Sequence, residues 1–340
     1  MKEAIEFIKK CHVNQVLFQK VNTFGNTVKE ELLLGSVLKV SFKDLKIEKA
    51  FIDDYERFGK LGIVEYIVVH DTGNNNLGAN GLMHIKFLES KPPVSWHYTV
   101  DDNGVYQHLP ENIIGYHAGD GLRPFKLIDT KIKAKSKNPK VTISDDGYYM
   151  IDEEKTNIKA PLINDRIPKT EDITPSGVIT FIGDNSNYYI SETYLNKGYQ
   201  KISNQGGGTN GIGIESCVDE GSDLYATWQN LAKLVAHLLI KHNLGLERVM
   251  QHNHFSGKNC PQTLRTSNLW DYFMEMVSLE YALQKNFSNY KFLLKTKSNL
   301  INKNGKLINM PTEKTNIEYT VTIINDKNEK CEVNLVSFVE

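Results

Sequence analysis

Apolar residues recur along this chain with two different periods, which predict helices in one part and strands in another. From 223 to 244 they return at every third or fourth position, as on the buried face of an amphipathic helix ended by Asn243 or Gly245. A second helix is expected from about 267 to 283. Elsewhere the apolar runs are short, rich in β-branched residues and separated by Gly, Asn and Asp, as strands are. A mixed α/β fold follows.

Two of the short runs are almost wholly apolar, and each contains a single acidic or basic side chain. The run 66–70 (YIVVH) predicts a strand buried on both faces, and it ends in His70, where ligands of open α/β sheets bind. The run 211–218 (GIGIESCV) carries Glu215 at its middle. A buried carboxylate is costly unless it is paired, hydrogen-bonded or close to a metal, and general bases often have a raised pKa. The alternatives are a histidine that caps a turn and a glutamate exposed at a strand end.

The stretch 251–261 (QHNHFSGKNCP) follows the first helix and is predicted to be a loop. It contains two imidazoles, an ammonium and a thiol, and His and Cys are the preferred ligands of zinc. With His70, one histidine of the loop and Cys260 give three protein ligands and leave a fourth position for water, as in catalytic zinc sites. His252 and His254 compete for the same role, and their spacing alone does not choose between them.

Weaker patterns predict how the chain is divided. A main α/β domain is expected at 45–280, with an N-terminal extension at 1–44. The segment 122–206 contains strand–turn patterns around Asp-Gly and Asp-Asn, which predict an inserted β-rich subdomain. The segment 286–340 is strand-like and is expected to form a small β-sandwich-like domain without catalytic residues.

Composition and charge exclude several functional classes. The 340 residues have a formal net charge of -1, so no global basic field attracts nucleic acid or anionic lipid. Four cysteines are scattered without a pairing rhythm, which is unlike a secreted disulfide-stapled module. No apolar run approaches the roughly 20 residues of a membrane span, and the N-terminus lacks the apolar core of a Sec-type signal. We therefore expect a soluble protein made in a reducing compartment, with neither nucleic acid nor membrane as partner.

Five motifs in order carry a family resemblance: VVHDTGN, SWHYTVDDNGVYQHLP, GYHAGDG, GIGIESC and QHNHFSGKNCP. The chain resembles the zinc-dependent N-acetylmuramoyl-L-alanine amidases of the amidase_2 group, which includes phage endolysins, bacterial autolysins and, more distantly, peptidoglycan recognition proteins. The resemblance covers roughly residues 45–121 and 207–275. It implies an α/β fold in which helices flank a central mixed β-sheet, with zinc (Zn2+) in a surface groove. A weaker resemblance links the C-terminal segment to bacterial immunoglobulin-like domains.

The resemblance also assigns roles to residues of this chain. It implies the zinc ligands His70, His252 and Cys260, because the family's ligand cysteine lies eight residues after its partner histidine. It implies Glu215 as the catalytic glutamate and Lys258 as the catalytic lysine. The residues expected to face the substrate are Trp96, His117 and Asn74. Trp96 stands where many relatives have a catalytic tyrosine, so Glu215 must act as the base here.

The implied activity is hydrolysis of the amide bond between N-acetylmuramic acid and L-alanine of the peptidoglycan stem peptide. In this mechanism zinc binds the water and the scissile carbonyl oxygen, Glu215 relays a proton to the leaving amine, and Lys258 stabilises the oxyanion. The expected partner is peptidoglycan and the expected place of action the cell wall, reached after holin release or lysis. The alternatives are a non-catalytic peptidoglycan-binding protein and a zinc-stabilised structural protein. The cysteine ligand argues against the first of these.

Overall fold

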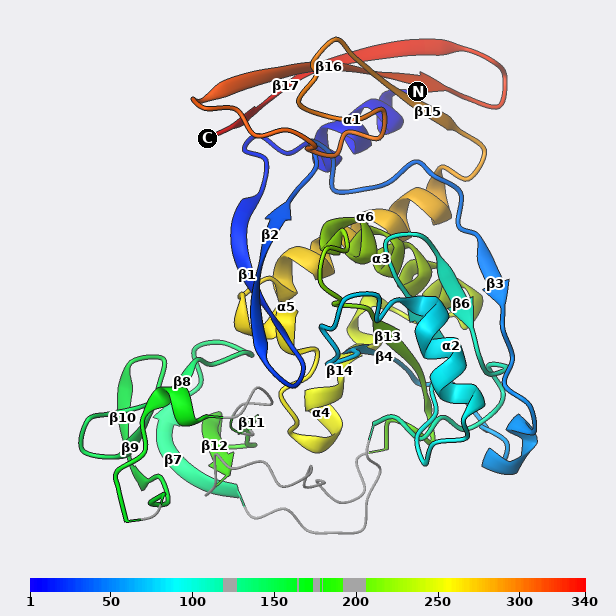
Figure 1. Cartoon of the computed structure of the whole chain (residues 1–340). Helices are drawn as coiled ribbons and strands as arrows, with labels where there is room; N and C mark the ends of the chain where they lie inside the picture. The colour runs from blue at the N-terminus through cyan, green and yellow to red at the C-terminus, as the bar shows by residue number, and fades with distance from the viewer. Residues whose placement is uncertain (119–126, 164, 174–177, 179, 192–205) are drawn as a thin grey trace.

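A central sheet organises the computed structural model, which describes residues 1–118, 127–163, 165–173, 178, 180–191 and 206–340 (Figure 1). Its six strands lie in the order β14-β4-β13-β5-β6-β3. β14, β4, β13 and β5 are parallel, β6 is antiparallel to β5, and β3 is parallel to β6. The strands are β3 (Ile47–Lys49), β4 (Tyr66–Asp71), β5 (Tyr98–Val100), β6 (Val105–Gln107), β13 (Gly211–Ser216) and β14 (Val249–Gln251). The predicted mixed sheet is confirmed.

Alternation along the central strands gives the sheet one face that packs on the main core and a second face that carries His70 and Glu215. We call the second face polar, although Val68 there packs against Ala118 and Phe255. Ile67 and Val69 of β4 and Ile214 of β13 pack into the main core with the helices α3 (Leu224–Lys241) and α6 (Trp270–Asn286). Successive side chains of a strand point to opposite faces, so His70 and Glu215 project away from these helices. The two predicted helices are confirmed, with their ends shifted by one to three residues.

Further short elements surround the polar side of the sheet. The helix α2 (Gly81–Glu89) contacts β5 and β6, and α4 (His252–Ser256) contacts β14 and β4. The stretch 251–261 therefore contains a short helix where a loop was predicted. The remaining helices of the main domain are α5 (Gln262–Thr266) and the 3-10 helices η1 (Tyr55–Phe58) and η3 (Leu246–Arg248).

The two chain ends fold together at the top of Figure 1. The helix α1 (Lys2–Cys11) shares one apolar cluster with the antiparallel sheet of β15 (Lys291–Thr296), β16 (Thr315–Ile324) and β17 (Lys330–Val339). Helix α1 covers this sheet where a β-sandwich would have a second sheet. The hairpin of β1 (Phe18–Phe24) and β2 (Val28–Leu34) runs from there to the main domain, where Asn75 donates hydrogen bonds to backbone oxygens of Thr23 and Thr27.

The insertion has its own strands and its own apolar cluster, as the predicted β-rich subdomain requires. It forms two three-stranded antiparallel sheets, β10-β9-β8 and β11-β12-β7. Its elements are β7 (Leu127–Lys133), β8 (Val141–Ile143), β9 (Tyr148–Ile151), β10 (Glu154–Lys159), η2 (Thr170–Asp172), β11 (Thr180–Ile182) and β12 (Asn187–Ser191). Parts of the predicted insertion, and residues 119–121 of the GYHAGDG motif, lie outside the described residues. Among the described residues, no helix is long and apolar enough to cross a membrane.

Candidate metal centre and groove

His70 and Glu215 meet at the carboxyl ends of two neighbouring parallel strands. They are direct partners in the register of β4 and β13, and both lie on the polar face of the sheet. The Nδ1 atom of His70 is 3.8 Å from Oε1 of Glu215. The polar residue that interrupts each apolar run is thus brought to one place by strand pairing, because parallel strands carry equivalent positions to the same edge.

Three donor atoms gather beside this pair. His70, His252 and Cys260 are all buried, and their ligand atoms lie within 4.8 Å of one another; this is the one such donor group among the described residues. The Sγ atom of Cys260 is 3.8 Å from Nδ1 of His70. A tetrahedral zinc ion with ordinary Zn–N and Zn–S bonds would separate these two atoms by about 3.6 Å. The donor set therefore fits zinc in kind, number and spacing.

The protonation states of the donors also suit a metal. Burial lowers the pKa of both imidazoles well below the usual value, so His70 and His252 are neutral at pH 7, as metal ligands must be. Burial raises the pKa of the Cys260 thiol in the metal-free protein. A bound cation reverses that effect, because a coordinating thiol is deprotonated outright.

His254 does not join the donor group. It is exposed and lies in a separate pocket with Asn253 and Arg265, and its ring meets that of Phe255 edge to face. In a helix, residues two positions apart point about 200° apart around the axis, so α4 cannot direct His252 and His254 to the same point. The structure thus separates two histidines that residue spacing left equivalent.

Two buried charged residues that the sequence did not single out hold the ligand-bearing segments. Asp71 accepts a hydrogen bond of 2.7 Å from the backbone N–H of Thr263, which ties the end of β4 to the chain just after Cys260. The guanidinium of Arg265 donates to Asn259 at 2.7 Å, to Gln251, and to Asn138 of the insertion at 2.8 Å. Thr263 is 192 residues from Asp71 and Asn138 is 127 residues from Arg265, so no local pattern could have revealed these two contacts.

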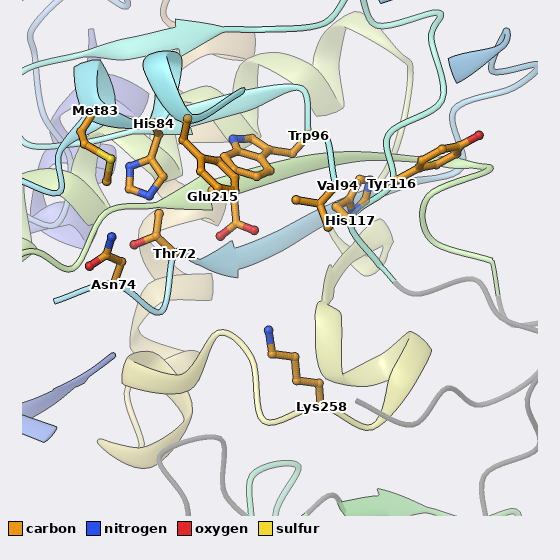
Figure 2. A pocket seen from close by; sticks show the side chains of 11 residues that line it. Thr72, Asn74, Met83, His84, Val94, Trp96, Tyr116, His117, Glu215 and Lys258 are labelled. Carbon is orange, nitrogen blue, oxygen red and sulfur yellow. The ribbon is translucent and has the colours of Figure 1, made fainter. Parts of the chain in front are cut away.

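A groove of about 280 Å³ opens beside the donor group (Figure 2). Glu215 and Lys258 line it, and their charged ends face each other across it. Trp96, His117 and Asn74, the three residues expected to face substrate, also line it. The other lining residues are Thr72, Met83, His84, Phe87, Val94 and Tyr116. The lining therefore combines charged and polar groups with apolar and aromatic side chains.

Glu215 is held in the groove as a carboxyl group of unusually high pKa. Its side chain is 14% exposed, and its Oε2 atom has no hydrogen-bond partner among the described residues. Burial raises the pKa of Glu215 to about 8, while the Lys258 ammonium opposes and Asp71 reinforces this shift. A cation bound at the three donors would favour the carboxylate. A group with this environment is suited to accept and return a proton.

A family model described as "N-acetylmuramoyl-L-alanine amidase" (Amidase_2) matches residues 60–263, which span both strands and the whole donor group. The chain belongs to the Amidase_2 family. Two curated relatives from Bacillus subtilis (strain 168) agree with this assignment. The N-acetylmuramoyl-L-alanine amidase XlyA is 26% identical over 209 residues, which cover 61% of this chain and 42% of XlyA. The amidase CwlH is 26% identical over 214 residues, 63% of this chain and 52% of CwlH.

The match thus spans about half the length of these relatives. Among solved structures, the catalytic domain of XlyA aligns with a TM-score of 0.40 and 24% identity, covering 68% of this chain and 99% of that one. The hydrolase AmiA of Staphylococcus aureus, solved in complex with its ligand, aligns with a TM-score of 0.41 and 14% identity, covering 71% and 86%.

Proposed function

We propose that this protein is a zinc-dependent amidase that hydrolyses the bond between N-acetylmuramic acid and L-alanine of peptidoglycan. The observation that carries the proposal is the meeting of a three-donor metal group, a carboxyl group of raised pKa and an ammonium in one groove. Family membership supports the choice of bond. Because peptidoglycan forms the cell wall, the cell wall is the proposed place of action.

The proposed ligands are His70, His252 and Cys260. Zinc bound there would supply a Lewis acid that polarises the scissile carbonyl and acidifies the attacking water. Glu215, 3.8 Å from the Nδ1 atom of His70, takes the proton of that water and passes it to the leaving amine of L-alanine. Its raised pKa favours the first transfer, since a carboxylate with a raised pKa is a stronger base.

Lys258 has two proposed effects, and both follow from its position across the groove. Its ammonium favours the ionised form of Glu215, because a nearby positive charge lowers the pKa of a carboxyl group. It also supplies a fixed positive charge where the scissile carbonyl becomes an oxyanion. A charge placed before the reaction needs no reorganisation during it, which is why such groups stabilise transition states strongly.

The aromatic residues Trp96 and Phe87, which line the groove, are proposed to contact the substrate. The ring of Trp96 stacks on Phe87 with centroids 6.0 Å apart, and its indole N–H donates to Oγ1 of Thr99 at 2.7 Å. The polar atom of Trp96 is therefore engaged within the protein, and its ring is left for packing against the sugar or lactyl group. This arrangement agrees with Glu215, rather than a residue at position 96, as the base.

A zinc-stabilised structural role is the other candidate, and the donor set argues against it. Structural zinc sites are closed by four protein ligands, whereas catalytic sites keep one position open. The described residues supply three donors, next to a groove large enough for a substrate. A non-catalytic binding protein would have no need for a carboxyl group held at high pKa beside the donors.

Mass spectrometry of a defined muropeptide, digested with and without a chelator, tests the proposal. We expect the zinc-loaded protein to release an intact stem peptide beginning with L-alanine, and the chelator to stop this release. Cleavage at another bond, or release unaffected by the chelator, would contradict the proposed reaction or its metal dependence. If the protein bound zinc but left the muropeptide undigested, the structural role would be favoured.

A further inference from the structure

His117 is the middle one of three buried histidines in a row that begins at the proposed ligand His70 and ends at His97. Its Nδ1 atom is 3.0 Å from Nε2 of His70, and the two rings meet edge to face at 88°. On its other side, the ring of His117 is 6.0 Å from that of His97. His117 also lines the groove, so it has one edge toward the substrate space and one atom toward a proposed ligand.

The direction of the hydrogen bond follows from the position of the donors. The Nδ1 atom of His70 faces Cys260 at 3.8 Å, so it is the nitrogen available to a metal and must carry no proton. The proton of neutral His70 then lies on Nε2 and is donated to Nδ1 of His117. Donation of its second nitrogen to a fixed acceptor is the arrangement that orients a metal-bound histidine.

Two glycines leave the space that the ring of His117, the acceptor, occupies. A Cβ atom at Gly213 of β13 would lie 2.5 Å from the ring of His117, and a Cβ atom at Gly115 would lie 2.7 Å from it. No other residue type fits at either position without moving the ring. His97 fixes the wall of this space, because its Nδ1 accepts a hydrogen bond from the Gly213 N–H at 3.1 Å and its Nε2 donates to the Ile113 carbonyl at 2.8 Å.

We propose that His117 is a positioning residue for the metal centre, which selects the tautomer of His70 and holds its ring so that Nδ1 points at the metal. This role is distinct from substrate contact and rests on the proposed metal site. Removal of such an outer partner typically weakens metal binding by about 10–100-fold. His117 then acts on the reaction through His70.

The test is the zinc dissociation constant, measured by competition with a chromogenic chelator. We expect His117→Ala to weaken zinc binding by about 10–100-fold. His117→Asn should stay close to wild type, because an amide oxygen can accept the same proton near the position of Nδ1. His84→Ala is the matched control, since His84 is a buried histidine of the same groove whose Nδ1 contacts the backbone oxygen of Asn80 at 2.8 Å. It should bind zinc as the wild type does.

Thermal unfolding of the metal-free variants shows whether each is folded. If His117→Ala does not fold, His117→Asn still tests the proposal, because a loss of zinc affinity in the folded His117→Asn variant would contradict it. Wild-type zinc affinity in His117→Ala, with only KM raised, would overturn the proposal and leave His117 as a substrate contact. An equal loss in His84→Ala would also overturn it. A wild-type protein that binds no zinc would instead overturn the metal-dependent function, so the two failures are distinguishable.

Discussion

Glu280 and Glu215 both lie close to a lysine and are almost inaccessible to solvent, but their surroundings differ. Glu280 of α6 and Lys233 of α3 form an ion pair of 2.8 Å, with side chains 1% and 8% exposed. Ser41 completes this pair, since its N–H donates to Glu280 at 2.8 Å and its carbonyl accepts from Lys233 at 2.7 Å. In the groove, Glu215 faces Lys258, and one of its oxygens has no hydrogen-bond partner among the described residues.

The difference separates a structural ion pair from a reactive carboxyl group. Around Glu280 every charge is met by a partner, which fixes the two helices and the segment near Ser41 in one arrangement. At Glu215 one carboxyl oxygen has no hydrogen-bond partner among the described residues, and burial raises the pKa of the group to about 8. A metal ion and a substrate would interact with this carboxyl group. Its incomplete hydrogen bonding therefore distinguishes the site from the structural pair.

Removing a proposed ligand should give the largest effect. We expect Cys260→Ala to abolish turnover and to weaken zinc binding by more than the roughly 10–100-fold that loss of an outer partner costs. Cys331→Ala, at a half-buried cysteine of β17, is the control and should change neither. Zinc content and turnover are measured together. Full turnover in Cys260→Ala would show that catalysis in the groove does not require the proposed metal site.

Lys258→Met should fold, keep zinc and lose turnover by roughly 10²–10³-fold, the usual cost of one oxyanion donor. Lys291→Met, in the exposed part of β15, is the control for loss of one lysine. The measurement is kcat at saturating muropeptide, with zinc content checked. If Lys258→Met kept the wild-type kcat, Lys258 would be only a neighbouring charge.

Glu280→Gln should break the structural ion pair and leave the catalytic groove unchanged. It leaves the Lys233 ammonium buried without its counter-charge, which typically costs about 3–5 kcal/mol of the free energy of unfolding. We expect this loss in denaturant unfolding, and wild-type kcat for the fraction that is folded. A variant with unchanged stability would show that the pair adds nothing to the fold.

Glu215→Gln should have the opposite effect on the stability of the metal-free protein. Burial raises the pKa of Glu215 from the ordinary 4.5 to about 8, so between these pH values the folded protein retains a proton that the unfolded chain releases. Wild-type stability therefore falls as the pH rises through this range. The variant avoids this loss and should be more stable than the wild type by about 2 kcal/mol at pH 8, since each pKa unit corresponds to about 1.4 kcal/mol and relaxation reduces the effect.

Denaturant unfolding at pH 4.5 and pH 8 measures this difference, and the buried histidines are common to both proteins and cancel. The advantage of Glu215→Gln should be almost gone at pH 4.5, where the carboxyl group is protonated in the folded chain and half protonated in the unfolded chain. An equal difference at both pH values would mean that Glu215 is not held at raised pKa.

Local patterns were sufficient for part of the fold and part of the site. The helix α3 and the strands β4 and β13 could be predicted because the spacing of their apolar residues is visible within one short stretch of sequence. His70 and Glu215 could be predicted as site residues because each is the one acidic or basic residue of an apolar run. The choice between His252 and His254 needed either the family resemblance or the turn of α4. The position of α1 against β15–β17 depends on contacts between opposite chain ends, which no local period contains.

The most direct test of the central claim is the rate at which zinc-loaded Glu215→Gln hydrolyses a defined muropeptide, relative to the wild type. The variant keeps the shape and the three donors but cannot carry a proton. We predict a rate lower by roughly 10²–10⁴-fold with zinc content unchanged, the range that general acid–base catalysis supplies. A rate close to that of the wild type would contradict the assignment of Glu215 as the general acid and base of the groove.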